Sequence, residues 1–109
     1  MQPTVYIMAS EKRGTLYVGV TSNLIQRAWQ HRQGITEGFS HRYGTKNLVY
    51  FEQHESMESA ILREKQIKKW RRQWKLDLLF KHNPDWQDLW ESIIEASLGK
   101  DNGFPPARE

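Results

Sequence analysis

The chain has no cysteine among its 109 residues, which excludes disulfides and cysteine-based zinc sites and suits a reducing compartment. No apolar run approaches the length of a membrane span, and the first ten residues lack a signal-peptide pattern. We therefore expect a cytoplasmic protein with no membrane partner. A chain of this length supports one core, and no internal repeat divides it.

We expect a single domain over residues 1–98. Its core is predicted at about 3–82, followed by a C-terminal helix at about 85–98 with Asp85 as its N-cap. Residues 99–109 combine glycine, proline and charge, a composition that predicts a flexible tail.

Several chemical motifs are also absent. There is no glycine-rich phosphate loop, no HExxH pair and no G-x-S-x-G elbow. The four histidines, His31, His41, His54 and His82, are not spaced as zinc ligands. Nucleotide-driven, zinc and serine-hydrolase chemistries are therefore disfavoured.

The positive charge is concentrated in one segment. Residues 56–82 hold eight basic and three acidic residues, whereas residues 83–109 hold two and six. Such a segment is either a nucleic-acid-binding surface or a solvated helix face. The candidate nucleic-acid-binding residues are Lys65, Lys68, Lys69, Arg71 and Arg72.

Three segments have the composition of strands: residues 3–10, a stretch that begins at Leu16 and turns at 19–22, and residues 47–53. A polar turn at 11–14 makes the first two an antiparallel hairpin. With helical patterns after them, the fold class is α+β, a small three-stranded antiparallel sheet flanked by helices. Alternation places Tyr6 and Tyr17 on the more polar strand faces, where two tyrosines also suit a sheet without any function.

The second strand leads into a helix that Ser22 or Asn23 can cap. On that helix Arg27 and His31 lie four residues apart and share an edge. A tyrosine, an arginine and a histidine could thus gather beside Gly19, a combination that suits phosphate chemistry. The polar loop at 32–44 adds residues that could reach a ligand, namely Phe39, His41, Arg42 and Tyr43.

A further helix is predicted from Met57 to about Trp74, with Ser56 as its N-cap. Residues 75–81 either extend it or begin another helix after a short kink, and Pro84 should end this helical segment. Glu64 falls on its apolar stripe, where an unpaired buried carboxylate would be costly. Glu64 must therefore pair with a cation, accept hydrogen bonds or hold a metal ion. A salt bridge to Arg27 or Lys68 is the structural alternative.

Together these residues resemble the GIY-YIG nuclease family, in particular its small single-domain bacterial members. The resemblance covers about residues 3–82 and is strongest in GTLYVGVTSNLIQRAWQHR and REKQIKKWRR. It departs from the family at its triplets, with Thr4-Val5-Tyr6 for Gly-Ile-Tyr and Val18 for isoleucine, and both changes keep a β-forming residue. The resemblance implies a cleft that holds one divalent metal, Mg²⁺ or Mn²⁺.

The resemblance also implies roles for five residues. Tyr17 would be the general base or orient the attacking water, and Tyr6 would position phosphate or water. Arg27 would stabilise the transition-state charge, and His31 would assist proton transfer or contact phosphate. Glu64 would hold the Mg²⁺ as its protein ligand.

The expected function is a Mg²⁺-dependent endonuclease that acts on DNA rather than RNA, on branched, damaged or single-stranded forms, in repair or recombination. Phosphate-directed binding predicts weak sequence preference, and targeting could come from a protein partner. A non-catalytic nucleic-acid-binding module of the same fold is the first alternative. A structural protein in which Arg27 and Glu64 form a salt bridge is the second.

Overall fold

The three predicted strands form one antiparallel sheet in the order β2–β1–β3, which confirms the α+β fold class. The structure, a computed structural model, describes residues 2–11, 14–34 and 44–101, with side chains up to residue 97. The strands are β1 (Thr4–Ala9), β2 (Leu16–Thr21) and β3 (Asn47–Gln53). The turn predicted at 19–22 is wrong, because β2 stays paired with β1 up to Thr21.

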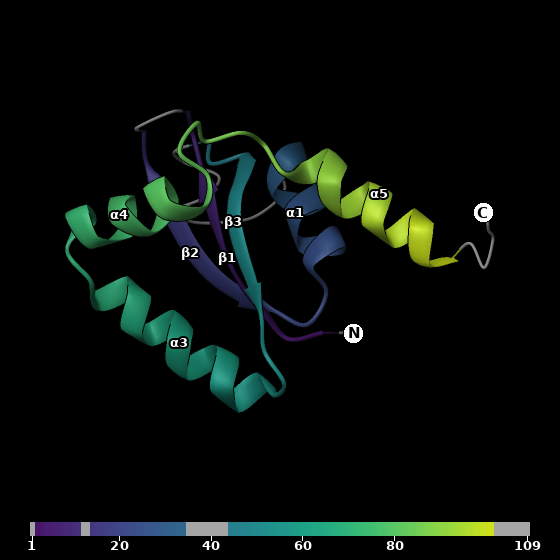
Figure 1. Ribbon diagram of the computed structural model, residues 1–109, viewed down its shortest axis with the longest axis horizontal. Helices are drawn as coiled ribbons and strands as arrows, with labels where there is room; N and C mark the ends of the chain where they lie inside the picture. Colours follow the sequence, from purple (N-terminus) through teal and green to yellow (C-terminus); the bar gives the residue numbers. More distant parts are fainter. Residues whose placement is uncertain (1, 12–13, 35–43, 102–109) are drawn as a thin grey trace.

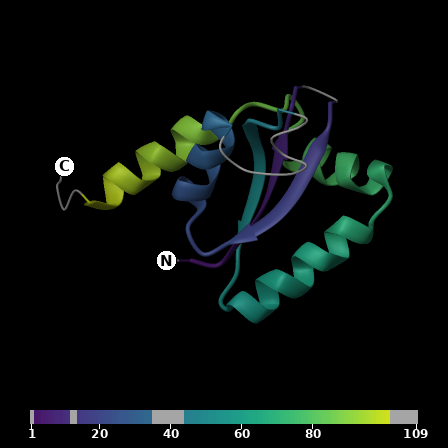
Figure 2. The ribbon, with the colours of Figure 1, turned by 180° about the vertical axis from the view of Figure 1, so that it is seen from behind.

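Helices cover both faces of the sheet (Figure 1). α1 and α5 lie on one side and α3 and α4 on the other, and the view from behind shows the same arrangement (Figure 2). In the described part of the chain, each helix is too short or too polar to span a membrane. The helices are α1 (Leu24–Gln33), α3 (Met57–Lys69), α4 (Arg72–His82) and α5 (Trp90–Asp101).

The alternating side chains of β1 supply two separate cores. Val5 and Ile7 pack with residues of α3 and α4, whereas Tyr6 and Met8 pack with Ala28 of α1 and with α5. All six residues of β1 are buried, because neighbours cover both its faces and both its edges. Tyr6, at the middle of the chain's most enclosed strand, is thus held rigidly.

The helix predicted from Met57 to about Trp74 ends earlier, at Lys69. Trp70 and Arg71 adopt extended backbone angles, and α4 then begins at Arg72. The two extended residues redirect the chain, so that Leu79 of α4 becomes fully buried against the sheet. Neither proline nor glycine lies at this break. This explains why the apolar spacing of the sequence predicted a helix that continued past Lys69. The predicted stop before Pro84 is confirmed.

The last helix was also misplaced: it runs over Trp90–Asp101 rather than 85–98, and Asp85 does not cap it. Asn83 holds the preceding segment in an irregular path. Its side-chain amide donates to the carbonyls of Val49 and Gln87, both at 2.9 Å. Trp86 in this segment has φ of 55°, a left-handed conformation that cannot begin a helix.

Asp88 performs the role that was predicted for Asp85. Its Oδ1 accepts from the backbone N–H of Trp90 at 3.2 Å and from that of Leu48 at 3.1 Å, while its Oδ2 pairs with Arg32. One carboxylate therefore fastens the start of α5 to both β3 and α1. This contact closes the α1–α5 face of the sheet.

Candidate active site

Four of the five predicted catalytic residues meet on the face of the sheet that α1 covers. Arg27 Nε donates to Tyr6 Oη at 3.3 Å, and Tyr6 Oη lies 3.2 Å from His31 Nε2. The Tyr17 ring centroid lies 5.1 Å from that of His31 and 6.3 Å from that of Tyr6. We call Tyr6, Tyr17, Arg27 and His31 the tyrosine–arginine cluster.

The start of α1 is fixed locally, and this sets where the two helical residues of the cluster lie. Asn23 is the N-cap: its Oδ1 accepts from Gln26 N–H at 3.2 Å, as the sequence predicted. Thr21 Oγ1 accepts from Asn23 N–H at 3.0 Å, which ties the cap to the end of β2. Arg27 and His31 then follow one turn apart and both reach Tyr6.

Gln30 is a member of the site that the sequence analysis did not identify. Its Oε1 accepts from Arg27 Nη1 at 3.0 Å, so Gln30 and Tyr6 hold the guanidinium from two sides. The only available signal was the three-residue spacing on the helix, which many surface pairs share. Fixing the guanidinium in advance is what transition-state stabilisation by an arginine requires.

Gly19 allows Tyr6 to occupy its place. The two residues are register partners in neighbouring strands, and both are buried. A Cβ on residue 19 would lie 2.5 Å from both Cζ and Oη of Tyr6, far inside van der Waals contact. Glycine is therefore needed here for space, since its φ is not positive.

We expect Gly19→Ala to destabilise the fold by about 1–3 kcal/mol and to displace the Tyr6 hydroxyl. Chemical denaturation of Gly19→Ala, alone and combined with Tyr6→Leu, measures the effect. Tyr6→Leu removes the atoms that the new methyl group would meet, so the extra cost of Gly19→Ala should largely disappear in that background. An equal cost in both backgrounds would contradict the steric explanation.

The environment of the cluster keeps Tyr6 and His31 uncharged at neutral pH. Burial, opposed by the hydrogen bond from Arg27, raises the pKa of Tyr6 to about 12. Burial and the positive charge of Arg27 lower the pKa of His31 to about 4. Tyr6 Oη accepts from Arg27, which can only donate, and the direction of its bond with His31 Nε2 is set by the tautomer of the neutral imidazole. Tyr6 is therefore suited to orient a ligand rather than to remove a proton.

The lowered pKa of His31 predicts how stability depends on pH. In the unfolded chain His31 takes up a proton below about pH 6.5, whereas in the native state it does so only near pH 4. Between these values the unfolded state binds more protons, so acidification should remove up to about 3 kcal/mol of stability.

Urea unfolding of wild type and His31→Gln between pH 8 and pH 4 measures this contribution. The variant should lose less stability than wild type over the same window. His82→Gln, which replaces an exposed histidine, is the matched control and should follow wild type. Parallel curves for wild type and His31→Gln would show that His31 does not supply the effect.

Glu64, the fifth predicted catalytic residue, lies outside the cluster. It projects from α3, in the helical layer that covers the opposite face of the sheet. Its side chain is 12% exposed, and its Oε2 lies 2.7 Å from Lys68 Nζ. Arg27 and Glu64, both within the described residues, form no ion pair with each other. Of the two partners that the sequence left open, the structure therefore selects Lys68.

The surroundings of Glu64 nevertheless fit a metal ion of the Mg²⁺ type. Among the described residues no three histidine, aspartate or glutamate side chains gather as ligands. Mg²⁺ commonly keeps several waters and takes only one or two carboxylates from a protein, so a single carboxylate fits it. The Lys68 side chain is 51% exposed and could move aside for a cation.

The predicted nucleic-acid-binding residues are all exposed, on α3, on α4 and at the junction between them. Arg72 also donates to the carbonyl of Gly14 at 2.8 Å, which connects α4 to the turn that precedes β2.

Trp70 packs against the core, and Trp74, 53% exposed, contacts its ring edge-on. The loop residues proposed to reach a ligand lie outside the described residues; they are Phe39, His41, Arg42 and Tyr43. The exposed basic residues are Lys65, Lys68, Lys69, Arg71 and Arg72.

The chain is similar to known proteins over most of its length. The model of the GIY-YIG catalytic domain matches residues 2–77. A UPF0213 protein of Clostridium perfringens (strain 13 / Type A) is 40% identical over 75 residues, which cover 69% of this chain and 80% of that protein. A UPF0213 protein of Syntrophus aciditrophicus (strain SB) is 36% identical over 89 residues, covering 74% and 92%.

Among solved structures, the solution NMR structure of a UPF0213 protein from Bacillus halodurans matches with a TM-score of 0.49 and 25% identity. The match covers 81% of this chain and 93% of that one. The family match spans well over half of the chain and includes every residue of the tyrosine–arginine cluster and Glu64. This chain therefore belongs to the GIY-YIG family of nuclease-type catalytic domains, together with its UPF0213 relatives.

Proposed function

We propose that this protein is a Mg²⁺-dependent endonuclease that hydrolyses phosphodiester bonds of DNA with weak sequence preference. Membership of a nuclease family supports the hydrolytic function. The observation that carries the proposal is the hydrogen-bonded series Arg27 Nε, Tyr6 Oη and His31 Nε2. It presents one fixed cation and one neutral hydroxyl at the same point, as a phosphate group requires.

Arg27 supplies the charge in this proposal. Two neighbours orient its guanidinium. Burial alone would lower its pKa, but the interactions with Tyr6 and Tyr17 together outweigh burial and raise the pKa, so Arg27 stays protonated. An arginine can bind two phosphate oxygens at once and stabilise charge that develops on them. Tyr6, neutral at physiological pH, orients phosphate or water beside it.

Tyr17 is the proposed group that orients or deprotonates the attacking water, since it lies against His31 and interacts with Arg27. Hydrolysis then breaks the bond from phosphorus to the departing 3′ oxygen, which takes up a proton. In this proposal neutral His31 donates from Nε2 to Tyr6 Oη, which holds the phenol in place and leaves the Tyr6 proton for phosphate or water. The family implies that a divalent metal activates water and offsets phosphate charge, and Glu64 is the residue that would hold it.

Glu64 and the tyrosine–arginine cluster could act together on a substrate that lies along β2. It is an edge strand, it carries Tyr17, and α3 packs against it. A nucleic-acid strand laid along this edge could meet Arg27 from one helical layer and Glu64 from the other. Its phosphates would be bound irrespective of sequence by the predicted contacts Lys65, Lys68, Lys69, Arg71 and Arg72.

Cleavage of a substrate panel tests the proposal. Supercoiled, single-stranded and branched DNA, and RNA, are incubated with the full chain in Mg²⁺, Mn²⁺ or EDTA. Metal-dependent cutting with DNA preferred is the expected result. Salt-sensitive binding without any cutting by folded protein would instead establish the non-catalytic binding module. Cutting confined to one DNA sequence would contradict the weak preference.

A further inference from the structure

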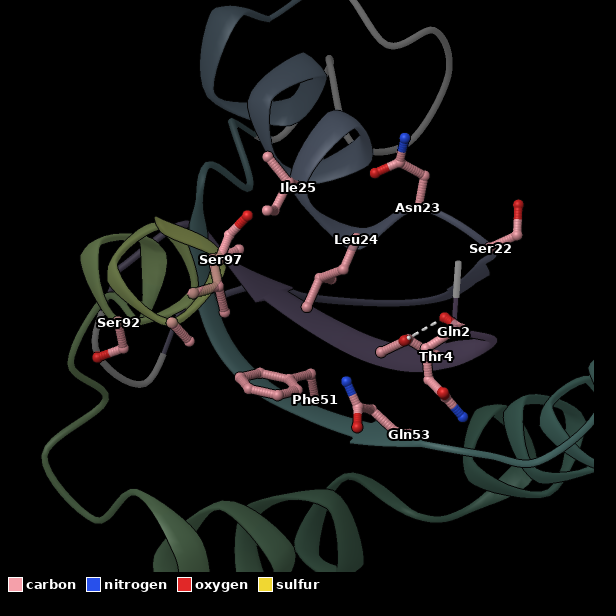
Figure 3. A pocket seen from close by; sticks show the side chains of 12 residues that line it. Gln2, Thr4, Ser22, Asn23, Leu24, Ile25, Phe51, Gln53, Ser92 and Ser97 are labelled. Atoms are coloured by element: carbon pink, nitrogen blue, oxygen red, sulfur yellow. Dashed lines mark hydrogen bonds between the residues drawn. The ribbon is translucent and has the colours of Figure 1, made fainter. Parts of the chain in front are cut away.

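A groove of about 300 Å³ opens on the same face of the sheet as the tyrosine–arginine cluster, between the start of α1 and α5. Leu24 of α1 and Phe51 of β3 point into it in Figure 3, with Gln53 and Ser97 at its margin. Ile93 and Ala96 of α5 form its far wall. It is a recess lined by two helices, α1 and α5, and two strands, β1 and β3, rather than a gap at one helix end.

This groove begins next to the proposed catalytic residues. Phe51 is the register partner of Tyr6 across the β1–β3 pair, so the two side chains stand side by side on one face. Leu24 precedes Arg27 by three residues, which places it one helical turn away on α1. A ligand group in the groove would thus lie beside a phosphate held at Tyr6 and Arg27.

The chemistry of the groove differs sharply from that of the rest of the protein. None of the described residues that line it is charged, although 27% of the chain is. It therefore offers no charged partner to a phosphate and favours a flat, uncharged group. Phe51 presents an aromatic side chain, and the Gln53 amide and the Ser92 and Ser97 hydroxyls supply hydrogen-bonding groups around it. Aromatic stacking with polar contacts at the edge is how proteins hold single bases.

We propose that this groove binds one unpaired nucleobase of the substrate, adjacent to the phosphate held by Arg27 and Tyr6. The proposal rests on the proposed nuclease function and assigns the groove its substrate contact. A single turn of a peptide helix, about 10 Å across and about 5.4 Å long, would occupy more than the roughly 300 Å³ of this recess. The base must be unpaired, because its edge faces the polar margin rather than a complementary base.

Filling the groove tests this assignment. Ala96→Phe adds a ring from the α5 wall at an exposed position, and Glu95→Phe adds the same ring to the same helix away from the groove. The probes are a DNA strand of about eight nucleotides and the same sugar–phosphate chain without bases, in EDTA. Wild type and Glu95→Phe should bind the strand with bases about 10-fold tighter than the abasic chain. Ala96→Phe should lose most of that difference while still binding the abasic chain.

Equal binding of the two strands by wild type would overturn the proposal, as would an unchanged preference in folded Ala96→Phe. If Ala96→Phe fails to fold, Ser92→Phe fills the groove from another exposed position of α5. Binding in EDTA is independent of cleavage, so the two proposals can fail separately. If the protein prefers the strand with bases but does not cut DNA when metal is present, only the nuclease proposal is contradicted. If it cuts DNA but binds both strands equally, only the groove proposal is contradicted.

Discussion

Arg27→Ala is expected to lower the rate of DNA cleavage about 10³-fold, the range seen when a single charge-stabilising group is removed from an active site. The guanidinium is held by Tyr6 and Gln30, so its loss removes an oriented donor rather than a mobile surface charge. Arg27→Lys should also be strongly impaired, because an ammonium cannot bind two phosphate oxygens in a planar fork. Single-turnover cleavage at saturating enzyme measures both variants.

Lys81→Ala is the control for the loss of a positive charge, because it removes an exposed cation from α4. Its cleavage rate should stay within a few-fold of the wild-type rate. DNA binding in EDTA should change far less than cleavage in the Arg27 variants, which separates chemistry from affinity. Circular dichroism checks that each variant is folded, and Arg27→Lys keeps the charge and aliphatic stem if Arg27→Ala is unstable. A folded Arg27→Ala with a near wild-type cleavage rate would exclude Arg27 from the reaction.

Glu64→Gln is expected to remove Mn²⁺ binding and to reduce metal-dependent cleavage by about 10³-fold, since it deletes the charge of the only proposed protein ligand. The substitution keeps the shape of the side chain. Titration of Mn²⁺ by calorimetry measures the metal directly and does not depend on activity. Loss of cutting with metal binding unchanged would show that Glu64 acts on something other than the metal.

Lys68→Ala distinguishes a metal ligand from a structural ion pair. Both variants break the Glu64–Lys68 pair, so a purely structural role predicts equal losses of stability and no effect on metal. If Glu64 holds the metal, Lys68→Ala should bind Mn²⁺ at least as tightly as wild type, because a competing cation has been removed. Only Mn²⁺ affinity and thermal stability are compared here, since Lys68 is also a proposed nucleic-acid contact.

The sheet and the tyrosine–arginine cluster could be predicted because both depend on local periodicity. Strand alternation put Tyr6 and Tyr17 on one face, and a four-residue spacing put Arg27 and His31 on one helix edge, so a single docking of α1 brings them together. The Glu64–Lys68 pair is local too, since the two residues lie four apart on one helix. What the sequence could not decide is whether Arg27 lies near Glu64, because that depends on which layer α3 joins.

Both errors in helix bounds have tertiary causes. No proline or glycine follows Lys69 to indicate the break in the sequence. The break is stabilised by the burial of Leu79, ten residues later. Asp85 and Asp88 look alike as capping residues, and the difference arises because Leu48 of β3 offers its N–H to Asp88. The lowered pKa of His31 likewise follows from burial and from Arg27, neither of which composition reveals.

The enclosure of β1 has a consequence for how the protein is made. The four residues of the tyrosine–arginine cluster all occur within the first 31 positions, yet β1 acquires its second neighbour only at Asn47–Gln53. The face they occupy is closed later still, by Ile93 of α5. During synthesis the catalytic side chains therefore emerge long before the structure that orients them. The nascent chain cannot assemble the site until nearly the whole domain has left the ribosome.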